Sequence, residues 1–462
     1  MHSPSSRSSR LRLTLLGLAL SAVAGVAGAQ AFSQPDDDFN GRVRAMSPVV
    51  LPGSEVEFGG MNFKPGQAVT LLRGDAVLND APLVADDEGR FTATVQIPDD
   101  AVVGRHPVVV RVANPDAAAV FDLKISREVP LSGQDAFEVA SNKLVPGLYQ
   151  VAWSAASDAL FVTSAVGRPP ITRSELLKLD PQTLEITARA TPAAAPGRDD
   201  GHLFAVYGVG VDDANGNVWV ANTRDDTVAV YRQSDLSLVK QFEAGAVPHA
   251  RDVVVDEGNG RAWASAVFGN AVVAFDTGTL ELLQTVEIDS GVRGGEFGPM
   301  SLAFDADAGK LYTVSMGSNE AAVIDSASGT VEKVFSLPGA LGASGVAIDA
   351  DNGRLYVASQ GSDNLLILDV DSGQVLHDVY VGAGALHVSF DPSTGLAFVS
   401  SRGAGTITVV NGDGEIVANL DGGTYPNQAF NDGNGTVYAV NKARGADDPQ
   451  GDHIRRISRK SP

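Results

Sequence analysis

A unit of roughly 40 to 60 residues recurs seven times along most of this chain and limits what it can fold into. Each copy opens with a short apolar segment that ends in a polar turn residue: Ser154, Asp212, Asp256, Asp305, Asp349, Asp391 and Asn431. A second apolar segment follows, usually after a glycine, with an aromatic in second place: Phe161, Trp219, Trp263, Tyr312, Tyr356, Phe398 and Tyr438. Four short strands per unit with turn signals between them are typical of a β-propeller blade. The pattern predicts an all-β chain with a seven-bladed β-propeller at residues 135–460.

The last unit supplies only three strands before the chain stops, at residues 427–430, 436–441 and 454–458. An open ring would expose the edge of a sheet, so a fourth strand has to come from elsewhere. The segment 136–142, just before the first unit, resembles the fourth strands of other units. We therefore expect it to pair into the last blade and close the ring.

The N-terminus has the features of a secretory signal. Arg7, Arg10 and Arg12 precede an apolar run at 13–26 and the small residues 27–29, which predicts a signal peptide at 1–29 and a periplasmic product. An uncleaved membrane anchor is the alternative, and no later apolar run is long enough to span a membrane. Signal removal leaves 31 basic against 56 acidic residues, a charge of about −25 that disfavours nucleic acid as a partner.

The segment cores 355–359 (LYVAS) and 218–222 (VWVAN), each followed by an Asp/Asn pair, resemble the YVTN-repeat family. Stretches such as 148–153, 248–253 and 425–428 are similar to the periplasmic YncE-like propellers within it. The resemblance covers about 325 residues and implies the propeller fold. It implies little about activity, because such proteins mostly lack an assigned reaction, and some are linked to nucleic-acid binding.

Residues 40–126 lie outside that resemblance. Their Pro-Gly and Asp-x-x-Gly turns between alternating segments resemble bacterial immunoglobulin-like modules and favour a small β-sandwich. Residues 30–39, with three successive aspartates, are interpreted as a flexible leader. Residues 127–134 are interpreted as a linker.

Long, varied loops are expected on one face of the propeller and short acidic turns on the other, and binding usually occurs on varied loops. Four residues before the turn residue, equivalent positions include Gln150, Asp252, His387 and Asn427. Arg251 stands one residue earlier, in the place of Tyr149 and Tyr207. Together with His249 and Arg402 from the loops, these residues are predicted to form a polar, aromatic-rimmed ligand site at the channel mouth. The alternative is that Arg251, Asp252 and His387 satisfy backbone groups or each other inside the ring.

These residues favour a noncatalytic periplasmic binding or scaffold protein that engages a protein, peptide or small ligand. We predict no catalytic residue, no metal site and no cofactor, because no nucleophile motif, phosphate loop or paired histidine motif is present. A lactonase-like or lyase-like enzyme is the first alternative, since related folds host such activities. Single-stranded nucleic-acid binding, which requires stacking aromatics in a basic groove, is the second.

Overall fold

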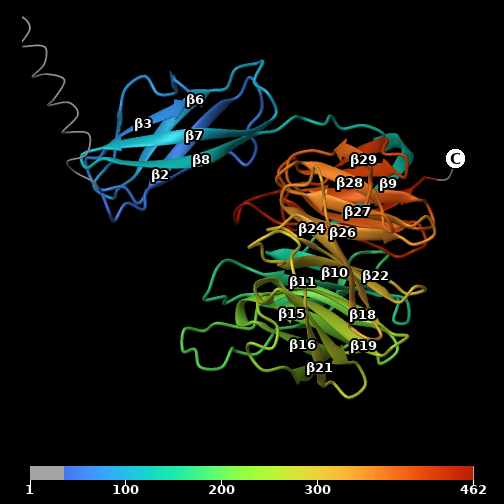
Figure 1. Ribbon diagram of the computed structural model, residues 1–462. Helices are drawn as coiled ribbons and strands as arrows, with labels where there is room; N and C mark the ends of the chain where they lie inside the picture. The colour runs from blue at the N-terminus through green and yellow to red at the C-terminus, as the bar shows by residue number, and fades with distance from the viewer. Residues whose placement is uncertain (1–35, 461–462) are drawn as a thin grey trace, which may run out of the picture. The chain divides into compact units, whose positions relative to one another are not determined.

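The computed structural model describes residues 36–460, which divide into two compact units, one ending at Ser126 and the other beginning at Arg127 (Figure 1). The predicted signal peptide and residues 30–35 of the leader lie outside this range. Helical structure within it is confined to three short 3-10 turns, η1 (Gln134–Ala136), η2 (Thr223–Asp225) and η3 (Val267–Gly269). No helix in the described part of the chain is long and apolar enough to cross a membrane.

The first unit contains two antiparallel sheets that share one core. One sheet has the order β1 (Arg42–Ala45), β2 (Glu55–Met61) and β6 (Phe91–Gln96). The other has the order β4 (Ala76–Val77), β3 (Ala68–Arg73), β7 (Gly104–Ala113) and β8 (Ala117–Ile125), with β5 (Leu83–Val84) paired to β3. Buried and exposed residues alternate strictly along β6, as expected when one face of a strand is covered. Phe58 of the first sheet and Leu71 of the second lie in the same apolar cluster.

Residues 36–39, which we expected in a flexible leader, make specific contacts within the first unit. The ring of Phe39 packs edge-on against Phe63, with 5.7 Å between ring centroids. The carboxylate of Asp36 pairs with the Lys64 ammonium and accepts a 3.1 Å hydrogen bond from Gln67 Nε2. The contacts of the first unit therefore include residues that we assigned to the leader. A local sequence pattern does not reveal such contacts, because the partners lie about 25 to 30 residues further along the chain.

The second unit consists of four-stranded antiparallel sheets, of which seven occur within residues 127–460. In pairing order their strands are β10 (Leu148–Ser154), β11 (Ala159–Ala165), β12 (Ser174–Leu179) and β13 (Ile186–Ala190); β14 (Val206–Asp212), β15 (Asn217–Asn222), β16 (Thr227–Arg232) and β17 (Leu238–Gln241); β18 (Ala250–Asp256), β19 (Arg261–Ala266), β20 (Ala271–Asp276) and β21 (Leu282–Glu287); β22 (Pro299–Asp305), β23 (Lys310–Ser315), β24 (Glu320–Asp325) and β25 (Val331–Ser336); β26 (Ala343–Asp349), β27 (Arg354–Ser359), β28 (Asn364–Asp369) and β29 (Val375–Tyr380); β30 (Ala385–Asp391), β31 (Leu396–Ser401), β32 (Thr406–Asn411) and β33 (Ile416–Asp421); and β34 (Pro426–Asn431), β35 (Thr436–Asn441), β36 (His453–Arg459) and β9 (Phe137–Lys143).

The first strands of the seven sheets form a closed circuit. Each contacts the first strand of the next sheet, from β10 through β14, β18, β22, β26 and β30 to β34, and β34 contacts β10. The strands approach closely enough that a Cβ atom added at Gly210 would lie 2.7 Å from the carbonyl oxygen of Val253. At Gly345 it would lie 2.6 Å from the Cα atom of His387. Small residues at these positions therefore permit the close packing of adjacent sheets.

The last sheet is completed from the beginning of the second unit. β9 pairs antiparallel with β36 along its whole length, from Phe137 opposite Arg459 to Lys143 opposite His453. This confirms the predicted pairing of 136–142, with the strand displaced by one residue. Phe137 is buried and packs edge-on against Phe398 of β31, with 6.3 Å between centroids. The closing strand thus bonds to its own sheet and packs against the preceding one.

The residues we interpreted as a linker run along the second unit. Ser132 forms a β-bridge with Asn419, whose side-chain amide donates to the carbonyl of Val129. The guanidinium of Arg127 lies 4.5 Å from the ring centroid of Tyr380. These contacts position the chain as it enters β9.

Candidate functional site

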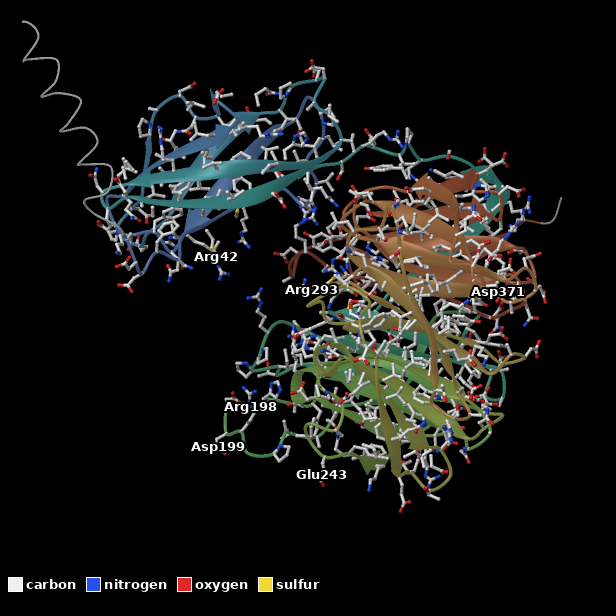
Figure 2. All side chains as sticks on the ribbon, in the orientation of Figure 1. Arg42, Arg198, Asp199, Glu243, Arg293 and Asp371 are labelled. Carbon is white, nitrogen blue, oxygen red and sulfur yellow. The ribbon has the colours of Figure 1, made fainter. Side chains whose placement is uncertain are left out.

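The two sides of the second unit differ in their loops. Arg198 and Asp199, between β13 and β14, and Arg293, between β21 and β22, lie on one side, whereas Asp371 lies on the other (Figure 2). Turns on the Asp371 side are short and are held by aspartate side chains, as where Asp369 accepts hydrogen bonds from the backbone N–H and hydroxyl of Ser372. Aspartate is favoured there because its carboxylate bonds the backbone of a tight turn. Seven of the nine predicted site residues begin first strands, on the side with longer loops. His249 directly precedes β18, and Arg402 directly follows the second strand β31.

A β-bulge occurs where the predicted residues enter the first strands. In β10, Leu148 and Val151 pair with Ser164 and Val162, so that two residues of β10 face one residue of β11. The same irregularity occurs in β14, β18 and β22. A bulge changes the direction of the side chains that it contains. Two neighbouring side chains, such as those of Tyr149 and Gln150, can therefore point in different directions and contact different residues.

Gln150 and Asp252, the second residues of two such pairs, brace the ring, and Gln428 of β34 makes an equivalent contact. Side-chain oxygens accept backbone N–H groups of the next first strand: Gln428 from Val151 at 3.0 Å, Gln150 from Val209 at 2.9 Å and Asp252 from Leu302 at 3.0 Å. Gln150 also donates to Asp252 at 3.2 Å, and burial raises the pKa of Asp252. Gln150 and Asp252, both predicted as ligand contacts, thus use their polar groups inside the ring. For Asp252 this matches the structural alternative considered above.

Tyr149 is the centre of a second set of contacts. Arg251 Nη1 donates to the Tyr149 hydroxyl at 2.7 Å, and Asn427 Nδ2 donates to the Tyr149 carbonyl at 2.6 Å. Arg402 Nη1 donates to Asn427 Oδ1 at 2.6 Å. The ring of Tyr207 meets that of Tyr149 edge-on, with 4.5 Å between centroids. Five of the nine predicted residues therefore meet, although they are spread over nearly 280 positions of the sequence.

Several residues of this assembly were missing from the predicted set. Lys442 Nζ lies 4.6 Å from the centroid of the Tyr149 ring, and Arg224 lies 5.8 Å from that of Tyr207. Arg402 and Arg444 lie 5.0 and 5.3 Å from the centroid of Tyr425. Arg224, Arg402 and Lys442 each follow the end of a second strand by one or two residues, a shared position that aligning the repeats would have revealed. We define the Tyr149 cluster as Tyr149, Tyr207, Arg224, Arg251, Arg402, Tyr425, Asn427, Lys442 and Arg444.

The two predicted histidines have different surroundings. His249 stacks on Phe268 with 4.1 Å between centroids, and its backbone N–H donates to Asp226 at 2.7 Å. His387 is buried, and burial together with the charge of Arg251 lowers its pKa to about 3. The imidazole of His387 is therefore neutral at physiological pH, and its Nδ1 lacks a hydrogen-bond partner among the described residues. Within residues 36–460, no three His, Asp or Glu side chains are grouped closely enough to hold a metal ion.

The cations of the Tyr149 cluster repel one another. Burial and the charge of Arg402 are the main causes that lower the pKa of Lys442 to about 8, with Arg251 and Arg224 contributing and Asp452 opposing. Burial and the charge of Arg251 also lower the pKa of Arg402. In the described part of the chain, none of the cluster's five cations forms a salt bridge. By contrast, Arg198, in the loop between β13 and β14, pairs with Asp200 at 2.7 Å. The cluster is thus a local concentration of positive charge in a strongly acidic protein.

Comparison with known proteins gives weak sequence similarity and a clear likeness of fold. No family model matches the chain. The uncharacterised YncE proteins of Salmonella typhimurium and Salmonella typhi are each 26% identical over 328 residues, covering 68% of this chain and 87% of theirs. Hydrazine synthase of Kuenenia stuttgartiensis superposes with a TM-score of 0.55 at 16% identity, over 69% of this chain and 96% of that structure. A catalytically inactive virginiamycin B lyase of Staphylococcus aureus, solved with quinupristin, superposes with a TM-score of 0.53 at 13% identity, over 70% of this chain and 99% of that structure. The structural likenesses concern the fold alone, and with the YncE similarity they support a YncE-like β-propeller.

Proposed function

We propose that this chain is an exported, seven-bladed propeller of the YVTN-repeat type that binds a ligand without catalysis at the Tyr149 cluster. The closed circuit of first strands and the pairing of β9 with β36 support the seven-bladed ring. The two sheets around a shared core support an immunoglobulin-like sandwich for the first unit. Periplasmic export follows from the signal pattern at residues 1–29. A small ligand, or the end of a peptide or protein, is the expected occupant.

The state of Arg251 carries this proposal. If Arg251 had only a structural role, its guanidinium would pair with Asp252 or another carboxylate, and all of its N–H groups would donate to protein atoms. Instead, Arg251 is only 8% exposed, donates to the Tyr149 hydroxyl, and has an Nε group without a partner among the described residues. The guanidinium of Arg251 thus forms no closed pair with a carboxylate of the described residues. A bound molecule with acceptor oxygens would compensate its charge.

Ligand screening by thermal shift tests the proposal. We expect at least one compound from a set of organic acids, sugars, nucleotides and short peptides to raise the melting temperature of the wild-type protein. Arg402→Gln should abolish that rise, because Arg402 belongs to the cluster. Arg261→Gln is the matched control, since Arg261 bonds the Ser326 carbonyl at the opposite end of its sheet and should leave the rise unchanged. Equal shifts in both variants would place the ligand elsewhere.

A further inference from the structure

The Tyr149 ring lies against two cations that form no salt bridge with any residue between 36 and 460. Arg251 is 5.3 Å and Lys442 is 4.6 Å from its ring centroid. The carboxylate that opposes the lowered pKa of Lys442 is that of Asp452. Its Oδ1 accepts the backbone N–H groups of Gly147 at 2.8 Å and Ala443 at 3.2 Å, which hold it in the loop. The charge of Lys442 is therefore poorly compensated within the protein itself.

The tyrosine rings of the cluster are occupied in a way that disfavours stacked bases. Tyr149 has two cations against its ring and the edge of Tyr207 beside it, and Tyr425 has two guanidinium groups. Sequence-independent binding of single strands depends on aromatic faces on which successive bases stack. Phe268, 74% exposed and stacked on His249, is a lone exposed ring beside the cluster. The arrangement favours a compact anion over an oligonucleotide.

We infer that the Tyr149 cluster binds a small organic anion through carboxylate or phosphate oxygens, with Arg251, Arg402 and Lys442 as its contacts. The inference rests on the proposed function and specifies the chemistry of the ligand. Guanidinium groups present paired donors that match both kinds of oxyanion, and a lysine ammonium adds a point charge. Such a ligand would relieve the mutual repulsion of Arg251, Arg402 and Lys442.

Binding of the anion is coupled to proton uptake. Burial is the largest cause that destabilises the protonated form of Lys442, and the charges of Arg402, Arg251 and Arg224 add to it. A bound anion offsets the charge of these arginines. The pKa of Lys442 therefore rises on binding, and near pH 8 the complex holds more protons than the free protein. Affinity is then strongest below the pKa of the free lysine and falls as the pH rises through it. From pH 7 to pH 9 we expect a loss of about tenfold, set by the protonated fraction of Lys442.

Calorimetric titration of the purified protein with citrate and with inorganic phosphate tests the inference. We expect at least one to bind at pH 7, about tenfold more weakly at pH 9, with an apparent enthalpy near pH 8 that depends on the ionisation enthalpy of the buffer. Lys442→Met should weaken binding and remove the pH dependence. Lys333→Met is the matched control, because Lys333 bonds backbone carbonyls of Val370 and Asp371 away from the cluster, and should behave as wild type.

The outcomes separate the two proposals. Absence of citrate and phosphate binding overturns the anion inference, as does equal binding by Lys442→Met and wild type. If a neutral compound alone raises the melting temperature and loses this effect in Arg402→Gln, the proposed binding function stands and the anionic chemistry fails. If oligothymidylate binds below micromolar concentration at about 0.15 M salt and Lys442→Met abolishes it, the ligand is nucleic acid instead.

Discussion

Replacing Phe137 tests whether the strand before the first sheet closes the second unit. Phe137 is the first residue of β9, is 5% exposed and packs on Phe398 in an apolar cluster that includes Leu396 and Ile457. Phe137→Ala removes this packing and leaves a cavity between the last two sheets. Burial of a phenylalanine in a core is worth about 3–5 kcal/mol, of which the edge-on aromatic pair supplies about 0.5–1.5 kcal/mol. We expect the free energy of unfolding of the second unit to fall by about that amount.

Urea denaturation followed by tryptophan fluorescence measures this effect on the second unit alone, because the chain's three tryptophans are Trp153, Trp219 and Trp263. Val139→Ala is the control: Val139 lies in the same strand but is 46% exposed, so its truncation should cost less than about 1 kcal/mol. If Phe137→Ala also costs less than about 1 kcal/mol, or unfolds at the same urea concentration as Val139→Ala, the strand does not hold the ring closed.

Two further changes probe the ring and its interior. Gly345→Ala should destabilise the second unit by about 1–3 kcal/mol, because the added Cβ atom would lie 2.6 Å from the Cα atom of His387. Gly317→Ala is the control, since the nearest atom to its added Cβ lies 3.8 Å away. Equal urea midpoints of the two variants would refute the close packing at Gly345. The folded-state pKa of His387, about 3, lies below its ordinary value of 6.5, so the unfolded chain binds more protons between these values and stability is lost as the pH falls through this window. His387→Asn should therefore reduce the loss of stability on acidification by at most about 1.4 kcal/mol per pH unit, and identical pH profiles of the two proteins would contradict the buried, neutral imidazole.

The repeat made the second unit predictable, because each strand type recurs with the same turn and the same buried aromatic. The missing fourth strand even indicated the pairing of residues 136–142, since an unpaired edge had to be covered. The contacts of Phe39 and Asp36 were not predictable in this way. Their partners are distant in sequence, and the three aspartates beside them suggested a solvated segment.

Part of the grouping of the candidate site residues could be predicted for a similar reason. Equivalent positions in the repeat predicted that Tyr149, Arg251 and Asn427 lie close together, and hydrogen bonds join them in the structure. The direction of Gln150 and Asp252 could not be inferred, because a bulge at the start of the strand changes the alternation of side chains. Tyr425 lies in a loop of individual length, where position in the repeat carries less information, whereas Lys442 directly follows a second strand, as Arg402 does, and could have been found by aligning the repeats.

The affinity and the melting temperature of Arg251→Ala, measured side by side, test the binding role of the Tyr149 cluster most directly. The side chain gives up one hydrogen bond to Tyr149, worth about 0.5–1.5 kcal/mol, and its loss also relieves repulsion with Arg402 and Lys442. We therefore predict a change in melting temperature of less than about 3 °C, together with loss of the ligand that binds the wild-type protein. A clearly lower melting temperature with unchanged ligand affinity would show that Arg251 only supports the ring, and would contradict the account.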